Sequence, residues 1–487
     1  MPAPHSDSNL SRSMSKNSKN EGDLERLGAA PSNVVGEIHS VPEEGHDAVF
    51  GDLNEKGPNY RNVGWLGSAV LMMKTQIGLG VLSIPSNFDT LGIVPGVICL
   101  LLIAGITTWS GHMVGVFKLN HREIYGIDDT MGKILGPWAR NVFGVIFVLY
   151  WIFVAGSGML SVSIGLNSVS THGTCTAVFV AVAAIIGFSL ASIRTFGKIS
   201  FLAWLGVISI LTSIWTVTIA VGVQDHPAAA PAPAPGTQWV SDYKIVNNPS
   251  FTKAAAAISS LVFSYAAPPA FFSIAAEMKE PRQYTKALLL CQGVVSVTYV
   301  AIGCVVYYFC GSYVASPALG SAGVTIKKAC YGIALPGLIV STTIVTHLPA
   351  KYVFVRILRG SRHLVSNSLV HWGTWFACTF SATLIAYIIA SAIPVFSDLV
   401  SLIGALFGTL LCFQPMGAMW LYDNWGQGKT NRSPRWVAMV CWSVFVILSG
   451  TFLMIAGTYG SAVSIKESYA ATGGSAAWSC ADNSNST

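Results

Sequence analysis

Charge is scarce in this chain: Asp, Glu, Lys and Arg together make up 10% of its 487 residues. Hydrophobic residues make up 52%, and they gather in runs of about 20 or more, the length that a helix needs to cross the hydrocarbon core of a bilayer. Runs of this length and number exclude an ordinary soluble domain. The sequence therefore predicts an all-α polytopic protein embedded in a lipid bilayer.

Eleven transmembrane helices are predicted within one membrane domain, residues 62–458. The expected spans are 62–85, 92–117, 140–165, 174–193, 197–222, 253–277, 285–310, 328–353, 371–394, 398–422 and 435–458. Short polar connectors separate most of them. Residues 459–487 are predicted to form a tail beyond the last span.

The first 61 residues lack any apolar run, which excludes a cleavable signal peptide in this segment. They carry ten acidic and six basic side chains and many Ser and Asn residues. A segment of this composition cannot bury enough apolar surface to fold. We therefore expect residues 1–61 to form a disordered cytosolic tail.

The net charge of +6 does not indicate a nucleic-acid partner, because the basic residues follow the positive-inside tendency. With the N-terminus in the cytosol, the cytosolic connectors and helix ends hold sixteen Lys or Arg residues and the opposite side holds five. This bias predicts a cytosolic N-terminus and a C-terminus on the outer side.

Motifs for metals, nucleotides and catalysis are also missing. The chain has no Cys-x-x-Cys motif and no cluster of His residues, so we expect no metal site and no bound cofactor. Gly428-Lys429-Thr430 resembles the end of a phosphate-binding loop but lacks the upstream glycine. The ten His residues are scattered, which disfavours a membrane-embedded enzyme. Four cysteines lie at the outer ends of spans, where a disulfide is possible, and the sequence leaves their pairing open: Cys175, Cys310, Cys330 and Cys480.

Two spans are interrupted near mid-membrane. The first contains Gly78 and Gly80, and the sixth contains Pro268-Pro269 within the stretch 264–270. Glycine weakens a helix and proline removes a backbone donor, and unwound backbone within a membrane is tolerated where it lines a cavity. The connector 224–252 separates five spans from five that enter the membrane inverted, so both breaks fall in the first span of a half. The alternative is a pair of ordinary kinked helices.

Three motifs resemble the amino acid/auxin permease family, and within it the neutral amino-acid permeases of filamentous fungi. They are the stretch 73–85 in span one (MKTQIGLGVLSIP), Phe263-Ser264-Tyr265 in span six, and the stretch 277–280 followed by Pro281 at the end of span six. The resemblance covers about residues 57–460. It implies a LeuT-type five-plus-five inverted repeat with discontinuous helices 1 and 6, an eleventh helix, and amino acid transport by proton symport or, in some members, with sodium.

An amino acid substrate needs partners for its carboxylate and its ammonium group. Free N–H groups where a half-helix starts bind anions, and free carbonyls where a half-helix ends accept from cations. We assign the carboxylate to Ile77, Gly78, Leu79 and Gly80, beside Thr75. Contacts to the ammonium group and the substrate side chain are assigned to Ser264, Tyr265 and Ala266 of span six. The scarcity of buried counter-charges favours neutral substrates.

Five residues are candidates for coupling to an ion. Lys74 is costly to bury, and we expect it to pair with Glu277; the alternative is a Lys74 side chain that reaches the inner surface and a solvated Glu277. Thr342 and Thr343 could complete a sodium site, and His347 could carry a proton. For both ideas the stronger alternative is a purely structural role, because Ser and Thr hydroxyls commonly bond to the backbone of their own helix.

Together these features predict a secondary active transporter that carries neutral aliphatic and aromatic amino acids into the cytosol with protons, by alternating access. The resemblance to uptake permeases favours the plasma membrane, with the vacuolar membrane as the alternative. Two further alternatives stay open from the residues: sodium coupling, and a membrane sensor that binds amino acids and transports little. The oligomeric state is left open by the sequence.

Overall fold

The computed structural model describes most of the chain beyond residue 62. The described residues are 46–47, 51–52, 63–193, 196–227, 229–231, 239–364, 367–393, 395–430, 432–471, 478 and 480–484. The chain divides into two units, residues 1–46 and 47–487. The predicted disordered tail, residues 1–61, lies outside the described residues except for two paired strands, β1 (His46–Asp47) and β2 (Gly51–Asp52).

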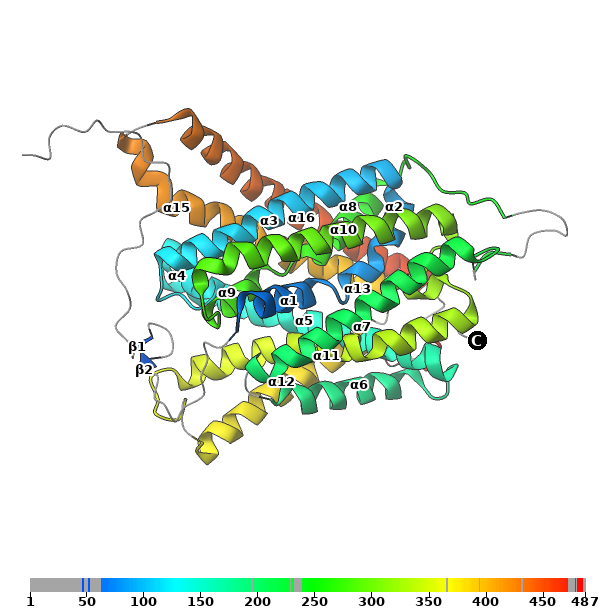
Figure 1. Cartoon of the computed structure of the whole chain (residues 1–487), viewed down its shortest axis with the longest axis horizontal. Helices are drawn as coiled ribbons and strands as arrows, with labels where there is room; N and C mark the ends of the chain where they lie inside the picture. The colour runs from blue at the N-terminus through cyan, green and yellow to red at the C-terminus, as the bar shows by residue number, and fades with distance from the viewer. Residues whose placement is uncertain are drawn as a thin grey trace, which may run out of the picture. The chain divides into compact units, whose positions relative to one another are not determined.

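Helices make up most of the described part of the second unit (Figure 1). The α-helices are α1 (Trp65–Gln76), α2 (Ile84–Leu91), α3 (Ile93–Asn120), α4 (Ile127–Leu135), α5 (Pro137–Ser170), α6 (Thr176–Ala191), α7 (Phe196–Val223), α8 (Phe251–Tyr265), α9 (Pro268–Ala276), α10 (Tyr284–Cys310), α11 (Val324–Leu358), α12 (Leu369–Ala392), α13 (Phe396–Ile403), α14 (Thr409–Cys412), α15 (Gln414–Thr430) and α16 (Pro434–Ala471). Short 3₁₀ segments are η1 (Gly80–Ser83), η2 (Pro281–Gln283), η3 (Gly311–Tyr313) and η4 (Ala318–Ser321), and η5 (Gly404–Gly408) is a π-helical turn.

Among the described residues, nine helices are long and apolar enough to cross a membrane, or ten if the bent pair formed by α1 and η1–α2 counts as one span. The predicted fourth span is helical but short: α6 has 16 residues, a rise of about 24 Å against a hydrocarbon core of about 30 Å. A polytopic helical membrane protein is therefore confirmed. The count of eleven and the inverted repeat stay predictions.

Both predicted helix breaks are present. α1 ends at Gln76, Ile77 is extended, and the chain bends by 40° before it continues as η1 and α2. Span six ends as α8 at Tyr265 and restarts as α9, with its two prolines in the first turn. Proline is tolerated there because the first N–H groups of a helix have no intrahelical acceptor.

Two predicted ends of spans are wrong. Span one was expected to stop at residue 85, but α2 runs on to Leu91, because Pro85 lies in the first turn of α2, where it does not interrupt the helix. The last span was expected to stop at residue 458, but α16 continues to Ala471. Its final turns pack with their neighbours: Ser464 Oγ donates to Asp398 Oδ1 at 2.9 Å.

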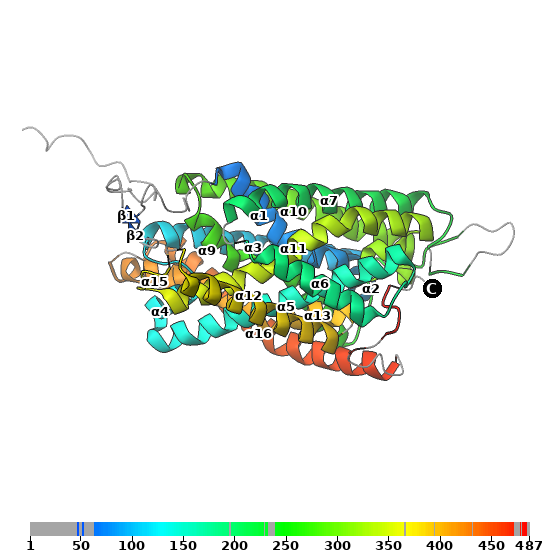
Figure 2. The same ribbon diagram turned by 90° about the horizontal axis from the view of Figure 1, so that it is seen from below.

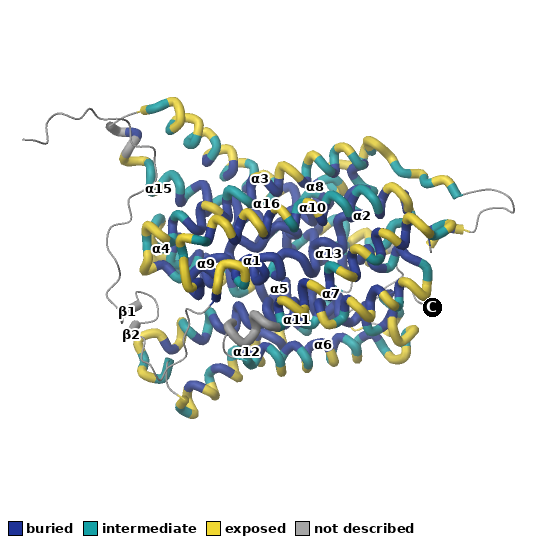
Figure 3. Tube along the Cα trace, viewed as in Figure 1, coloured by how far each residue is buried: buried dark blue, intermediate teal, exposed yellow. Residues whose placement is uncertain are grey.

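The broken helices lie inside the bundle. Figures 1 and 2 show α1, α10 and α11 running close together in both views, and α1 also packs against α7 and α9. α5, α6, α11 and α12 pack on one another in every pairing. Figure 3 shows the buried chain gathered around α1, α5 and α13, with exposed positions on the outward faces. Large apolar residues on those faces, such as Leu102 and Ile219, are more than 60% exposed, as expected for contact with lipid.

Candidate functional site

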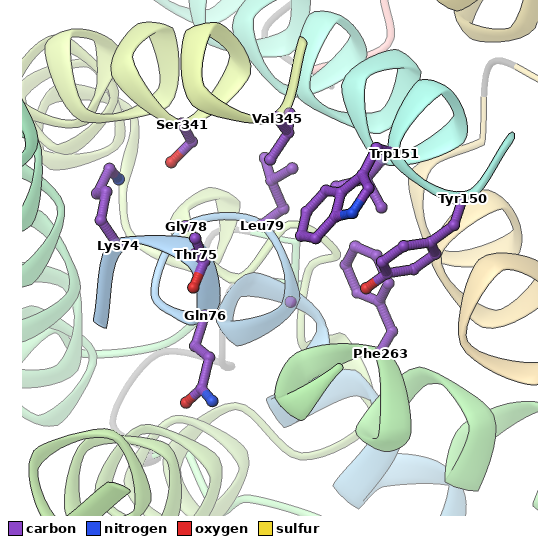
Figure 4. Close-up of a pocket in the computed structure, with 12 residues that line it drawn as sticks. Lys74, Thr75, Gln76, Gly78, Leu79, Tyr150, Trp151, Phe263, Ser341 and Val345 are labelled. Carbon is purple, nitrogen blue, oxygen red and sulfur yellow. The ribbon is translucent and has the colours of Figure 1, made fainter. Parts of the chain in front are cut away.

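A pocket opens at the break of the first span (Figure 4). Its walls come from α1 and the break, α5, α8 and α11, and its lining residues are Lys74, Thr75, Gln76, Gly78, Leu79, Gly80, Tyr150, Trp151, Val154, Phe263, Ser341 and Val345. Figure 4 shows Lys74 on one side and the rings of Tyr150, Trp151 and Phe263 on the other. The pocket thus combines unwound backbone, one cation and an apolar wall.

The two glycines of the first break permit close packing. A Cβ on Gly80 would lie 2.5 Å from Ser264 Cα, and a Cβ on Gly78 would lie 2.5 Å from Ser341 Oγ. Either approach is far inside van der Waals contact. Gly80 therefore lets the break of span one touch the end of α8, and Gly78 lets it touch α11.

Free backbone donors line the same place. Among the described residues, the N–H groups of Gly78, Leu79 and Gly80 donate no hydrogen bond to a backbone carbonyl. Successive free N–H groups at the start of a helical segment form an anion site. The segment chosen from the sequence for the substrate carboxylate thus has the donors that this role requires.

Two tyrosines that were not predicted from the sequence form hydrogen bonds with backbone carbonyls at the two breaks. The hydroxyl of Tyr299 lies 2.8 Å from Gln76 O at the end of α1 and 3.0 Å from Ser264 O near the end of α8. The hydroxyl of Tyr150 donates to Ala266 O, within the second break. A buried tyrosine hydroxyl needs a hydrogen-bond partner. The position of Tyr150 and Tyr299 within apolar spans was therefore the sequence signal that could have identified them.

Lys74 is buried, and its ammonium group donates to Ile77 O at 3.3 Å, inside the first break. Its stem runs beside Gly206 of α7, where a Cβ would lie 2.8 Å from Lys74 Cε. In the described part of the chain, no carboxylate lies within 4.0 Å of this ammonium group. Lys74 therefore places a cation between α1, α7 and α11 at the level of the pocket.

The predicted pairing of Lys74 with Glu277 is wrong. Glu277 instead forms a buried ion pair with Lys351 of α11, with Oε1 and Nζ 2.5 Å apart. The backbone of Glu277 is bound by Val63, whose N–H donates to Glu277 O at 3.3 Å. Val63 therefore marks the position of Glu277, and Lys74 lies eleven residues after Val63 in the chain. Eleven helical residues rise by about 16 Å, which is beyond the reach of a lysine side chain.

The other predicted residues divide between the pocket and its surroundings. Thr75 lines the pocket, with its hydroxyl bonded to Met72 O. Ile77, Ser264 and Ala266 lie at the breaks but outside the pocket lining, and Tyr265 donates to Ser296 Oγ at 3.2 Å. The carbonyl of Ile77 accepts from Lys74, that of Ser264 from Tyr299 and that of Ala266 from Tyr150.

The three candidates for ion coupling on α11 lie next to backbone carbonyls outside the pocket. Thr342 and Thr343 donate to Leu338 O and Ile339 O of their own helix, at 2.9 and 2.8 Å. His347 Nδ1 lies 3.1 Å from Ala191 O, and its ring packs against Trp375. The two threonines thus match the alternative in which they satisfy their own helix backbone, whereas His347 contacts the end of α6. None of the three lines the pocket.

Comparison with known proteins agrees with this geometry. Residues 61–463 match the family described as transmembrane amino acid transporter protein. A "Transmembrane transporter" of Gibberella moniliformis is 33% identical over 456 residues, covering 91% of this chain and 93% of its own. The "N amino acid transport system protein" of Neurospora crassa is 32% identical over 433 residues, covering 88% and 91%.

Two solved structures share the fold at low sequence identity. MhsT in complex with L-phenylalanine has a TM-score of 0.50 at 14% identity, covering 83% of this chain and 98% of MhsT. A Na⁺-coupled sialic acid symporter has a TM-score of 0.53 at 11% identity, covering 84% and 93%. These LeuT-like neighbours, the broken helices and the full-length relatives lead to one conclusion: the chain belongs to the transmembrane amino acid transporter family and is a membrane transporter, not an enzyme.

Proposed function

We propose that this protein is a secondary active transporter that carries neutral aliphatic and aromatic amino acids into the cytosol with protons. The observation that carries the proposal is the pocket at the broken helices, which joins free backbone donors to an apolar wall. The N–H groups of Gly78, Leu79 and Gly80 would bind the substrate carboxylate. Alternating access would open this pocket to each side of the membrane in turn.

The lining of the pocket supports a neutral substrate side chain. Apolar and aromatic surface comes from Tyr150, Trp151, Val154, Phe263 and Val345. Among the described residues, no Asp or Glu lines the pocket. A cationic side chain would therefore find no counter-charge. Ser341 Oγ and Trp151 Nε1 are buried without a partner among the described residues, which leaves them available to a bound substrate.

The position of Lys74 supports proton coupling over sodium coupling. Its ammonium group donates a hydrogen bond to the Ile77 carbonyl. That oxygen is one of the span-one carbonyls that a sodium ion would need as a ligand. Its amine is buried with no carboxylate within 4.0 Å among the described residues, and it would be the group that gains and loses a proton during a transport cycle. The predicted hydroxyl ligands, Thr342 and Thr343, bond to their own helix instead.

Uptake of labelled leucine and phenylalanine into proteoliposomes tests the proposal, with proton and sodium gradients imposed separately. We expect accumulation with the proton gradient alone, and competition by neutral amino acids but not by lysine or arginine. Accumulation that requires sodium would overturn the coupling. Binding without accumulation under either gradient would favour a sensor.

Substitution of Lys74 tests its role directly. Lys74→Met should abolish proton-driven accumulation, because it removes the proposed proton carrier at the break, while exchange of substrate across the membrane should persist. Lys286→Met is the matched control, since Lys286 is exposed at the start of α10. Normal accumulation by Lys74→Met with an unchanged pH dependence would remove Lys74 from the mechanism.

The plasma membrane, with the N-terminus in the cytosol, is the proposed location. The distribution of Lys and Arg residues supports this orientation. Selective labelling of an N-terminal epitope before and after permeabilisation of intact cells measures it. Labelling before permeabilisation would reverse the orientation.

A further inference from the structure

The last described residues of the chain fold back onto the helix bundle. Cys480 forms a disulfide with Cys175, which lies 305 residues earlier and directly precedes α6. Next to it, Ala481 O accepts from Thr176 Oγ1 at 2.6 Å. The sequence left four cysteines as candidates for pairing, and the structure keeps the other two, Cys310 and Cys330, as free thiols.

Polar contacts continue on both sides of the disulfide. Asn483 Oδ1 accepts from Asn167 Nδ2 of α5 at 2.7 Å, and Ser484 O accepts from Lys327 Nζ of α11. On the other side, Trp478 N donates to Ser391 O of α12 at 3.2 Å, and its ring packs against Tyr387 with centroids 5.1 Å apart. Asn167 and Lys327 are both buried, so these contacts are built into the end of the bundle.

These residues therefore touch four helices, α5, α6, α11 and α12, all at the same end of the bundle. The same four helices pack on one another in every pairing. Two of them form one wall of the pocket: α5 supplies Tyr150 and Trp151, and α11 supplies Ser341. The broken spans supply other parts of the lining: the end of α1 and its break supply residues such as Lys74 and Gly78, and α8 supplies Phe263.

We propose that residues 478 and 480–484 form a C-terminal strap, anchored by the Cys175–Cys480 disulfide, that fastens the ends of α5, α6, α11 and α12 together so that they act as one body during transport. A covalent link between such distant positions limits how far the four helix ends can separate. Conformational change is then left to the broken spans. A persistent disulfide also fits an extracytosolic compartment, in agreement with the proposed orientation.

Counting thiols in the full-length protein tests the anchor. Under denaturing, non-reducing conditions a maleimide reagent should label eight of the ten cysteines, and all ten should react after dithiothreitol supplies the two electrons and two protons that convert the disulfide to two thiols. Labelling of all ten before reduction would overturn the proposal.

Cysteine substitutions test what the strap does. Cys175→Ser, Cys480→Ser and the double variant should lower the melting temperature by the same several degrees, because each removes the same bond. Their maximal uptake rate should fall several-fold, with little change in the substrate concentration for half-maximal uptake. Cys441→Ser, at an exposed free cysteine of α16, is the matched control and should behave as wild type.

Asn483→Ala keeps the disulfide and removes one contact of the strap, so it should give a smaller decrease in both readouts. Wild-type melting temperature and uptake rate in the double cysteine variant would overturn the strap. The uptake readout rests on the proposed function, whereas the thiol count and the melting temperature do not. Failure of transport in the wild type would therefore contradict the proposed function. The thiol count and the melting temperature would still test the strap.

Discussion

Single hydrogen-bond donors determine how the broken backbone is held. Gln76 O and Ser264 O face one hydroxyl, that of Tyr299, and Ala266 O faces that of Tyr150. One hydroxyl proton can satisfy only one of the two carbonyls near Tyr299 at a time. A small movement of either broken span therefore changes which carbonyl receives it, at little cost in free energy.

Tyr299→Phe should lower stability and uptake together. It removes the donor from two buried carbonyls, and leaving one such group unsatisfied costs about 1–3 kcal/mol. The melting temperature in detergent and the initial uptake rate measure the effect. Tyr308→Phe on the same helix is the control, because Tyr308 is 46% exposed; equal behaviour of the two variants would contradict the role given to Tyr299.

The buried ion pair of Lys351 and Glu277 should be strongly coupled. Removing one partner leaves a buried charge unpaired, which costs about 3–5 kcal/mol. Lys351→Met and Glu277→Gln should each destabilise the protein, and the double variant should be less unstable than the sum of the two. Because the pair joins α11 to the end of α9, its loss should also change the rate of substrate release.

Melting temperatures of the four proteins in this double-mutant cycle measure the coupling. The exposed pair of Lys133 and Glu123 is the matched control, and its loss should cost less than about 1 kcal/mol. Additive effects of Lys351→Met and Glu277→Gln would show that the two residues do not interact.

At the scale of elements, each break forms for a different local reason. Span six breaks at Pro268 and Pro269, two adjacent residues that lack a backbone N–H donor and that lie in the first turn of α9. Span one has no proline at its break, and there Gly78 and Gly80 leave room for the helices on either side. The first break thus depends on packing with α8 and α11, and the second on covalent structure.

Gly80→Ala should therefore force the two breaks apart. The added Cβ would lie 2.5 Å from the backbone of Ser264, which cannot move aside as a flexible side chain can. Overpacking of this kind costs about 1–3 kcal/mol, and uptake should fall because the pocket wall is displaced. Gly105→Ala, at a lipid-facing position of α3 with no atom within 4 Å of the new Cβ, is the control; wild-type uptake by Gly80→Ala would refute this account.

At the scale of the whole molecule, the transport core should be independent of the first unit. All described residues of the pocket and of the strap lie within the second unit, residues 47–487. Deletion of residues 1–46 should leave the melting temperature and the proton-driven uptake close to wild type. Loss of uptake with substrate binding retained would favour a role for the N-terminal segment in transport or signalling.

The amino-acid sequence alone determined the class of protein, its approximate spans and the place of both breaks. Long apolar runs must cross a membrane, and glycine and proline act on the backbone of their own helix, so these features can be predicted locally. Thr75 and residues 77–80 were chosen for the site for the same reason. All of them except Ile77 line the pocket, and so does Gln76, which was not chosen.

Only the tertiary structure decided which side chains meet. The Lys351–Glu277 pair, the tyrosine hydroxyls at the breaks and the Cys175–Cys480 link join residues that lie far apart in the sequence, by 74 positions for the ion pair and 305 for the disulfide. Local composition carries no information on such contacts, since several lysines, tyrosines and cysteines were equally available. Packing of the helices selected among them, because a buried charge or carbonyl requires a partner within a few ångströms.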